Sequence, residues 1–119
     1  MNHQNGRKKL NLAAPHRRAL LRNQAITLIN YGHIASTKAR LKEVQRFVEK
    51  LVTIARAGNS YSLRRRVKAL LPYDDSALTT LFTEIAPRYT VRPGGYTRII
   101  PLGCRVSDTA PIARLEWVE

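Results

Sequence analysis

The stretch from Arg88 to Ile100 combines the side chains that proteins use to hold phosphates and to stack on nucleic-acid bases. It places three arginines and two tyrosines around Pro93-Gly94-Gly95. Arginine presents a planar fork that fits a phosphate group, and aromatic rings stack on bases. The stretch therefore predicts a nucleic-acid contact. The alternative is an ordinary connection between a helix and a strand, with a solvated rim.

Other residues that could do chemistry have plainer explanations. Asp74-Asp75 could form an acid–base pair, but they stand where carboxylates cap and stabilise the start of a helix. The three histidines are scattered, and the glycine pair lacks the rest of a phosphate-binding loop. Cys104 is the only cysteine, which fits a reducing compartment, and we expect it to be a small buried residue. We expect no enzyme activity, cofactor, metal or small-molecule substrate.

Two prolines predict how the chain leaves its helical part. Pro87 lacks the amide hydrogen that a helix needs, so it is expected to end the preceding helix. Proline followed by glycine at the centre of a turn is typical of type II geometry, which requires a positive φ at the glycine. The sequence therefore predicts a type II turn centred on Pro93 and Gly94.

Hydrophobic periodicity predicts the elements that must position these side chains. The clearest helical stripe is Leu41-Val44-Val48-Leu51-Ala55. It lasts only two heptads, so packing against the protein's own sheet is favoured over a coiled-coil partner. Gly32 is expected to end the first helix, and Ser36 or Thr37 to cap the second. The predicted helices span about 15–31, 38–57, 60–71 and 74–86, and the predicted strands about 33–37, 96–102 and 112–118.

These elements indicate an α+β fold, with two layers of helix and sheet. We predict a basic N-terminal arm, about four helices packed on a small mixed sheet, and a C-terminal β-hairpin. A length of 119 residues with 44% apolar content suits one domain with one modest core. Residues 1–14 have little to bury, so we interpret them as an arm that folds onto a polyanion and residues 15–119 as the domain.

Charge is the strongest indication of a partner. Lysine and arginine number 21 against 8 acidic residues, which gives a net charge of +13. Residues 1–42 hold nine of the cations and no acid. Such a balance favours a nucleic-acid partner, with an anionic membrane surface as the other candidate. No apolar run approaches the ~20 residues that span a bilayer, so we expect no membrane partner.

The residues also resemble a known family, the bacterial large-subunit ribosomal protein seventeen family. Gly6-Arg7-Lys8-Lys9-Leu10-Asn11 resembles its basic leader, and His16-Arg17 with Arg22-Asn23 resembles its first helix. Its most specific signature resembles the segment from Phe82 through Gly94-Gly95-Tyr96-Thr97-Arg98-Ile99. Ile34 with Ser36-Thr37 and Ala110-Pro111 complete a set that covers nearly the whole chain.

The resemblance implies a cytoplasmic, structural constituent of the large ribosomal subunit that binds rRNA near the peptide tunnel exit and stabilises its fold. It implies large-subunit rRNA and neighbouring large-subunit proteins as partners, and no catalysis. The residues predicted to bind rRNA are His3, Arg7, Lys8, Lys9, Asn11, His16, Arg17, Arg18, Arg22, Asn23, Lys38, Arg88, Arg92, Tyr96 and Arg98.

Two other functions remain open on the residues alone. A small basic DNA-binding or nucleoid-type protein is the first alternative, because helices separated by a short turn can mimic a helix-turn-helix. An RNA-modifying enzyme is the second, but it needs a cofactor or an acid–base site that the sequence does not display. The cluster Arg64-Arg65-Arg66 is either a solvated helix face or a further nucleic-acid contact, because consecutive helical residues point in different directions.

Overall fold

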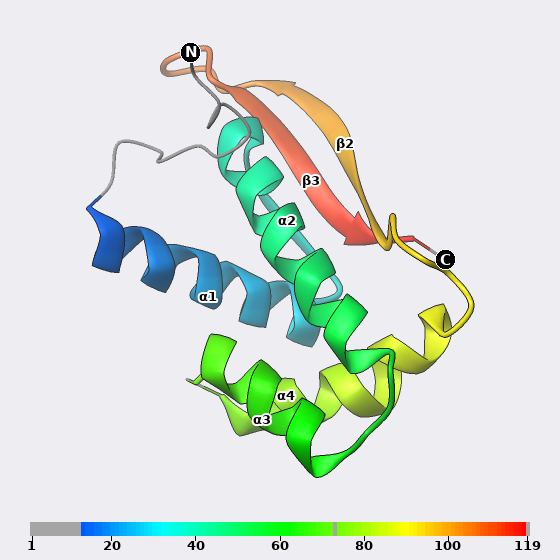
Figure 1. Ribbon diagram of the computed structural model, residues 1–119. Coiled ribbons are helices and arrows are strands. Elements are labelled where there is room, and N and C mark those ends of the chain that lie inside the picture. The colour runs from blue at the N-terminus through cyan, green and yellow to red at the C-terminus, as the bar shows by residue number, and fades with distance from the viewer. Residues whose placement is uncertain (1–12, 73, 119) are drawn as a thin grey trace, which may run out of the picture.

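The computed structural model describes residues 13–72 and 74–118. Figure 1 shows the helices gathered on one side of a small sheet. The elements are α1 (Ala14–Tyr31), β1 (His33–Thr37), α2 (Lys38–Ala55), α3 (Tyr61–Leu70), α4 (Asp75–Thr80), the π-helical turn η1 (Leu81–Ile85), the 3-10 turn η2 (Ala86–Tyr89), β2 (Thr97–Cys104) and β3 (Pro111–Trp117). The α+β class predicted from the sequence is confirmed.

The three strands form one sheet in the order β1-β3-β2. Strands β2 and β3 make the expected antiparallel hairpin, with Thr97 opposite Trp117. Strand β3 lies between the other two and also pairs with β1 in the antiparallel sense, with His33 opposite Glu116. The prediction of a mixed sheet is therefore wrong: both neighbours run against β3, so every pairing is antiparallel.

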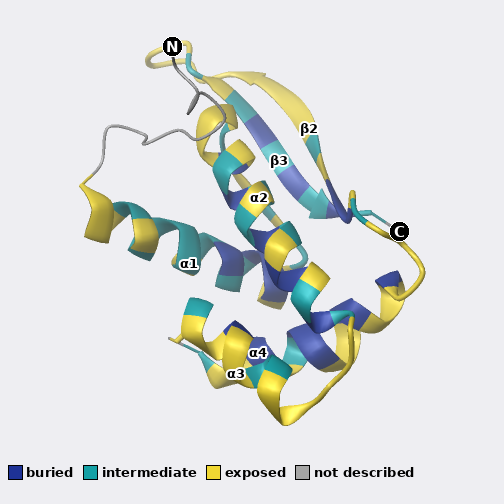
Figure 2. Cartoon of the chain, viewed as in Figure 1, coloured by how far each residue is buried: buried dark blue, intermediate teal, exposed yellow. Residues whose placement is uncertain are grey.

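Helix α2 is the centre of the core. Its five predicted stripe residues are all buried, and Val52 joins them. One side of α2 packs on all three strands, and α1 and α3 pack against the helix as well. Figure 2 shows the buried positions facing this centre and the exposed ones on the outside. The stripe thus belongs to the protein's own core, as predicted, and not to a coiled-coil seam.

Helix ends follow local rules with one exception. Gly32 ends α1 with φ +85°, a left-handed conformation that glycine adopts without strain, and its amide donates to the Leu28 carbonyl at 2.9 Å. The Ser60 hydroxyl accepts from the Leu63 amide at 3.3 Å and caps α3. Thr37 occupies the cap position of α2, but its hydroxyl makes no capping hydrogen bond, so that predicted role is corrected.

The last helical segment does not stop at Pro87. After α4 the chain widens into the π-helical turn and then tightens into a 3-10 turn that contains Pro87 in its first turn. A proline is tolerated there because the first amides of a helical turn need no partner inside it. The buried apolar stripe of Leu78, Leu81, Phe82 and Ile85 is as predicted, but the helical region extends to Tyr89.

The connection from η2 to β2 also differs from the predicted type II turn. Gly94 has φ +152° and Gly95 has φ +65°, whereas type II geometry places a φ near +80° on the residue after proline. A hydrogen bond from the Arg92 amide to the Tyr89 carbonyl, at 3.1 Å, closes a turn that precedes Pro93. Both positions have a positive φ, which glycine adopts without strain, but only Gly95 lies in the left-handed helical region.

We expect Gly95→Val to destabilise the protein by about 1–3 kcal/mol, because a β-branched residue is strained at a positive φ. A Cβ at this position would meet no atom within 4 Å, so the cost comes from the backbone alone. Gly95→Asn is the matched control, since asparagine tolerates this region better. Thermal unfolding of the three proteins measures the effect. Equal midpoints for Gly95→Val and the wild type would contradict the observed turn.

Candidate nucleic-acid interface

The first half of α1 carries exposed cationic and polar side chains and no acidic residue in its first turn. His16 and Arg18 are exposed, and Arg17 is half-buried. Figure 1 shows this end of α1 projecting away from the sheet and from the other helices. The positive end of the helix dipole adds to the side-chain charge, which favours an anion at this end.

Arg22 and Asn23 follow one turn later and have different environments. The Arg22 Nε donates to the Leu70 carbonyl at 3.0 Å, so this guanidinium satisfies an oxygen at the C-terminal end of α3. Asn23 is exposed. Arg22 therefore joins α1 to α3, a structural role that the sequence did not indicate.

The start of α2 supplies a second group of cations. Lys38, Arg40 and Lys42 are all exposed, and this first turn has no acidic residue. Arg40 lines a shallow hollow with Ser36 and Thr37. Of these three cations, only Lys38 is among the residues that the sequence predicts to bind rRNA. The absence of any acid before residue 43 was the signal that could have added the other two.

The two tyrosines of the Arg88–Ile100 stretch do not face solvent. Tyr96 is completely buried, and Tyr89 is 3% exposed. Their ring centroids lie 5.2 Å apart, and the Tyr96 hydroxyl is 3.2 Å from the Thr53 hydroxyl. The prediction that Tyr96 contacts rRNA is corrected, because a ring with no exposed surface cannot stack on a base. The two rings contact each other at an interplanar angle of 54° and both belong to the core.

The three arginines of the same stretch have different surroundings. Arg88 and Arg92 are exposed and line an open hollow beside Val91. Arg98 donates from Nε and Nη2 to one carboxylate oxygen of Glu116, at 3.0 and 2.6 Å. Figure 1 shows η2 far across the molecule from the start of α1. The predicted site residues therefore fall into two separate groups and not one site.

The cluster on α3 also divides. The Arg64 guanidinium lies 5.8 Å from the centre of the Phe82 ring and donates to Asn59 Oδ1 at 3.3 Å. The Arg65 guanidinium lies 5.6 Å from the Tyr61 ring centre. Arg66 is exposed. Two of the three guanidiniums thus lie over rings of the protein itself, so the cluster is not a single phosphate-binding face.

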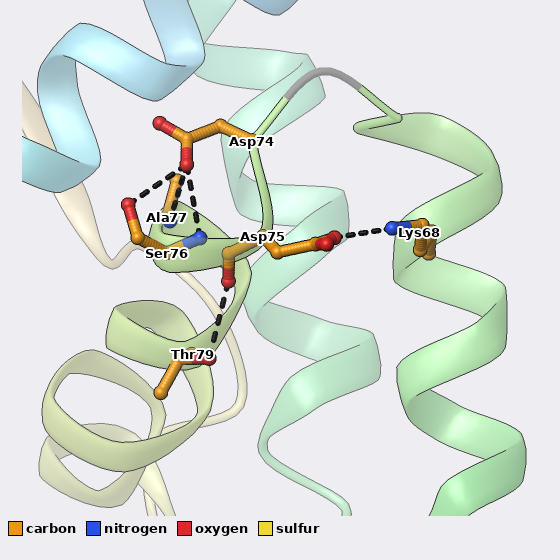
Figure 3. Close-up of polar contacts among 6 residues, drawn as sticks. All are labelled: Lys68, Asp74, Asp75, Ser76, Ala77 and Thr79. Atoms are coloured by element: carbon orange, nitrogen blue, oxygen red, sulfur yellow. Dashed lines mark hydrogen bonds and ion pairs between the residues drawn. The ribbon is translucent and has the colours of Figure 1, made fainter.

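The adjacent carboxylates at the start of α4 are structural. Figure 3 shows the Asp74 carboxylate accepting from the Ser76 hydroxyl at 2.8 Å and from the amides of Ser76 and Ala77 at 2.9 and 3.3 Å. These hydrogen bonds, that of the Ser76 hydroxyl first, lower the Asp74 pKa below its ordinary 3.8. Asp75 forms an ion pair with Lys68. The predicted capping role is confirmed, and the lowered pKa of Asp74 is the opposite of what a general acid needs.

We expect Asp74→Ala to lower the melting temperature at neutral pH, whereas Asp74→Asn keeps the amide contacts and most of the stability. Because the folded-state pKa of Asp74 is lowered, its contribution is complete above pH 3.8 and is lost as the pH falls through the folded-state pKa. The midpoints of wild type and Asp74→Ala should therefore converge in acid. Thermal unfolding between pH 7 and about pH 2 measures this, and a constant difference would contradict it.

The remaining reactive groups of the described residues do not gather into a metal site. Cys104 is exposed at the end of β2, so the expectation of a buried cysteine is wrong. Within the described part of the chain, no three histidine, cysteine, aspartate or glutamate side chains converge as metal ligands would. Over the same residues, no helix has the length and apolar character required to cross a membrane.

The arm residues predicted to bind rRNA lie outside the described residues. These are His3, Arg7, Lys8, Lys9 and Asn11. Among the described predicted residues, His16, Arg17 and Arg18 lie on the first half of α1, Asn23 lies at its middle, and Lys38 begins α2. Arg88 and Arg92 lie near η2.

Comparison with known proteins identifies the family of this chain. The family model described as Ribosomal protein L17 matches residues 20–118. Large ribosomal subunit protein bL17 of Sphingopyxis alaskensis is 44% identical over 119 residues, which cover 100% of this chain and 84% of that protein. The protein of the same name from Desulforudis audaxviator is 45% identical over 113 residues, 95% of this chain and 99% of that protein. The corresponding Brucella ovis protein is 41% identical over the full chain and 82% of its own length. A match of this extent shows that the chain belongs to the ribosomal protein L17 family.

Proposed function

We propose that this protein is a structural constituent of the large subunit of the cytoplasmic ribosome, that it binds rRNA near the peptide tunnel exit, and that it stabilises the fold of that rRNA. Family membership carries the proposal: the relatives are named as large ribosomal subunit proteins. A ribosomal protein family is structural, so the protein is not an enzyme. The location near the tunnel exit follows from the family resemblance.

The distribution of charge supports rRNA as the partner. Cations occupy the first halves of α1 and α2, where no acidic residue lies in either first turn. We propose His16, Arg17, Arg18, Asn23 and Lys38 as one contact surface, the helical cationic surface, with Arg40 and Lys42 added to it. Guanidinium and ammonium groups beside the positive ends of two helices suit the phosphates of a folded RNA. The arm would extend this surface through Arg7, Lys8 and Lys9.

The second group, Arg88 and Arg92, gives the protein a separate point of contact. The two side chains border an open hollow on the other side of the molecule from the start of α1. Cations at two distant corners would let one small domain touch two segments of a folded RNA, and contacts of this kind stabilise the arrangement of the segments. We exclude Tyr96 and Arg98 from the proposed interface because Tyr96 is buried and the Arg98 guanidinium is hydrogen-bonded to Glu116.

Sedimentation tests the assignment to the large subunit. We expect the protein to travel with the large subunit through a sucrose gradient and to remain there through a high-salt wash. Cross-linking in the purified subunit, followed by sequencing of the attached RNA, would then test the position near the tunnel exit. Recovery with the small subunit or with chromosomal DNA would overturn the proposal.

Helices α1 and α2 do not form the helix-turn-helix that the DNA-binding alternative requires. Helices α1 and α2 are separated by strand β1, and that strand is part of the sheet. A helix-turn-helix requires a short turn that places the second helix free in a major groove, whereas α2 packs on all three strands and on α1 and α3. Equal affinity for duplex DNA and for structured rRNA would nevertheless favour the alternative.

A further inference from the structure

A second hollow lies next to the one that Arg88 and Arg92 border, and Arg88 lines both. It has a volume of about 310 Å³ and forms where the ends of α1, α4 and β3 meet the turns η1 and η2. The side chains that bear on its chemistry are Tyr31, Thr80, Glu84, Arg88 and Trp117. We call it the Glu84 hollow. Its size is at the lower end of the range of small-ligand sites, which suits a group as small as one nucleic-acid base.

Glu84 is an acidic side chain that nothing in the described part of the chain holds. Every other acidic side chain in residues 13–72 and 74–118 makes a hydrogen bond, an ion pair or another electrostatic contact. Glu84 makes none within the same residues, and it is exposed. An unpaired carboxylate weakens the attraction of a cationic protein for phosphates. Its place in a hollow beside Arg88 therefore indicates a ligand that donates hydrogen bonds to it.

The backbone that carries Glu84 has an uncommon conformation. Glu84 lies in the π-helical turn η1, in which the Ala86 amide bonds to the Leu81 carbonyl five residues earlier. Single π-helical turns are rare and are frequently found at functional sites. Here the turn supplies one wall of the Glu84 hollow.

Tyr31 gives the same hollow an exposed aromatic ring. Its side chain is 73% exposed at the end of α1, whereas Tyr89 and Tyr96 are buried. Unpaired RNA bases stack on exposed rings of this kind and hydrogen-bond through their edges to nearby polar groups. Tyr31 can therefore make the base contact that burial denies to Tyr96.

Two other polar side chains of the hollow already have partners in the protein. Trp117 Nε1 donates to the Leu28 carbonyl at 3.3 Å, and the Thr80 hydroxyl donates to the Ser76 carbonyl at 3.0 Å. These hydrogen bonds fix the two side chains in place. Glu84 therefore remains as the charged acceptor of the hollow.

The two charges of the hollow favour a base over a phosphate or a cationic peptide. Glu84 would repel a phosphate placed beside it, and Arg88 would repel a lysine or arginine of another protein. A neutral base with N–H donors satisfies the carboxylate without either conflict. The phosphates attached to such a base would lie toward Arg88 and Arg92, which suit them.

From these observations we propose that the Glu84 hollow binds one unpaired guanine of the rRNA, with the base stacked on Tyr31 and its N1–H and N2–H groups donating to the Glu84 carboxylate. Guanine presents two N–H donors side by side on its Watson–Crick edge, and a carboxylate has two oxygens to accept them. The proposal rests on the proposed function, since rRNA is the partner there. It adds a base contact to an interface that is otherwise assigned to phosphates.

Chemical probing of purified large subunits tests the proposal. Kethoxal modifies N1 and N2 of guanines that are neither paired nor held by another group. At equal occupancy of the protein, we expect one guanine that is protected by the wild type to become about tenfold more reactive with Glu84→Ala and with Tyr31→Ala, a factor that corresponds to ~1.4 kcal/mol. Tyr61→Ala, at a tyrosine that is 77% exposed on α3, should keep the protection. No change in any guanine, or the same change with Tyr61→Ala, would overturn the proposal.

The sign of a charge effect supplies an independent test. Glu84→Gln and Asp75→Asn each raise the net charge by one, so electrostatic attraction alone would make both bind RNA more tightly. We expect Glu84→Gln instead to bind protein-free large-subunit rRNA about tenfold more weakly, with excess competitor RNA present, because an amide cannot accept both guanine hydrogens. Asp75→Asn should bind no more weakly than the wild type. The melting temperature of Glu84→Gln should be unchanged, and equal or tighter binding by this variant would overturn the proposal.

Photo-cross-linking distinguishes a base from a protein at this site. Tyr31→p-benzoylphenylalanine in purified large subunits should give an rRNA adduct at or beside the protected guanine. An adduct with a protein, or no adduct, would overturn the proposal. Failure of the wild type itself to sediment with large subunits would instead overturn the proposed function.

Discussion

The affinity of this protein for an isolated fragment of large-subunit rRNA is expected to fall by roughly 10³–10⁵ between 50 and 200 mM salt, as for a protein making about 6–10 phosphate contacts. The physical reason is release of counterions by the clustered cations, which give the chain its net charge of +13. Filter binding or fluorescence anisotropy over a series of salt concentrations measures the slope. A nearly flat curve would remove phosphate contact as the basis of binding.

Single substitutions show which side chains contribute to the salt dependence of binding. Arg18→Ala, Lys38→Ala and Arg92→Ala should each reduce the salt slope by about 1 if the side chain contacts one phosphate. The matched control is the pair Lys68→Ala with Asp75→Ala, which removes an ion pair outside both cationic groups without changing the net charge. This control should leave the slope unchanged. An effect of the control as large as that of Arg18→Ala would show that the helical cationic surface is not the RNA contact.

The largest effect on stability is expected from Tyr96→Ala, which should destabilise the protein by about 3–5 kcal/mol, as removal of a large buried aromatic residue does. Tyr96 has no exposed surface, packs on the Tyr89 ring and places its hydroxyl 3.2 Å from that of Thr53. The melting temperature should fall by roughly 10–20 °C. Denaturant unfolding followed by circular dichroism measures the free-energy change.

Two further tyrosine variants make that expectation specific. Tyr61→Ala, at a position that is 77% exposed, should change the stability by no more than about 0.5 kcal/mol. Tyr96→Phe should cost about 1 kcal/mol, because it removes one hydrogen bond and keeps the ring. Tyr96→Phe should also bind rRNA as the wild type does. Weaker rRNA binding by a stably folded Tyr96→Phe would restore the base contact that the sequence predicted.

The apolar periodicity of the sequence determined the helices and the identity of the core. The stripe along α2 is buried at every predicted position, since a 3.6-residue repeat can bury only one face of a helix. The hairpin and the capping role of Asp74 could also be predicted from the sequence, because turns and caps depend on neighbouring residues. The concentration of cations before residue 43 indicated an acidic partner, and the chain's family agrees with that interpretation.

Only the tertiary structure decided which side chains of the conspicuous Arg88–Ile100 stretch remain available. The local sequence does not show whether a tyrosine ring is exposed and able to stack on a base. In the folded protein, Tyr96 packs against Tyr89 and has no exposed surface. Arg98 forms an ion pair with Glu116, a residue 18 positions away that the antiparallel register places opposite it.

Long-range contacts likewise changed the roles of residues that the helical pattern placed on the outside. Glu49 on α2 accepts from both the amide and the hydroxyl of Thr97, at 3.2 and 2.8 Å, and holds the start of β2 against the helix. Arg22 bonds to a carbonyl 48 residues away on α3. Periodicity distinguishes an inner face from an outer one, but it contains no information on which distant backbone group will lie beside a given side chain. That depends on how the helices and the sheet pack together.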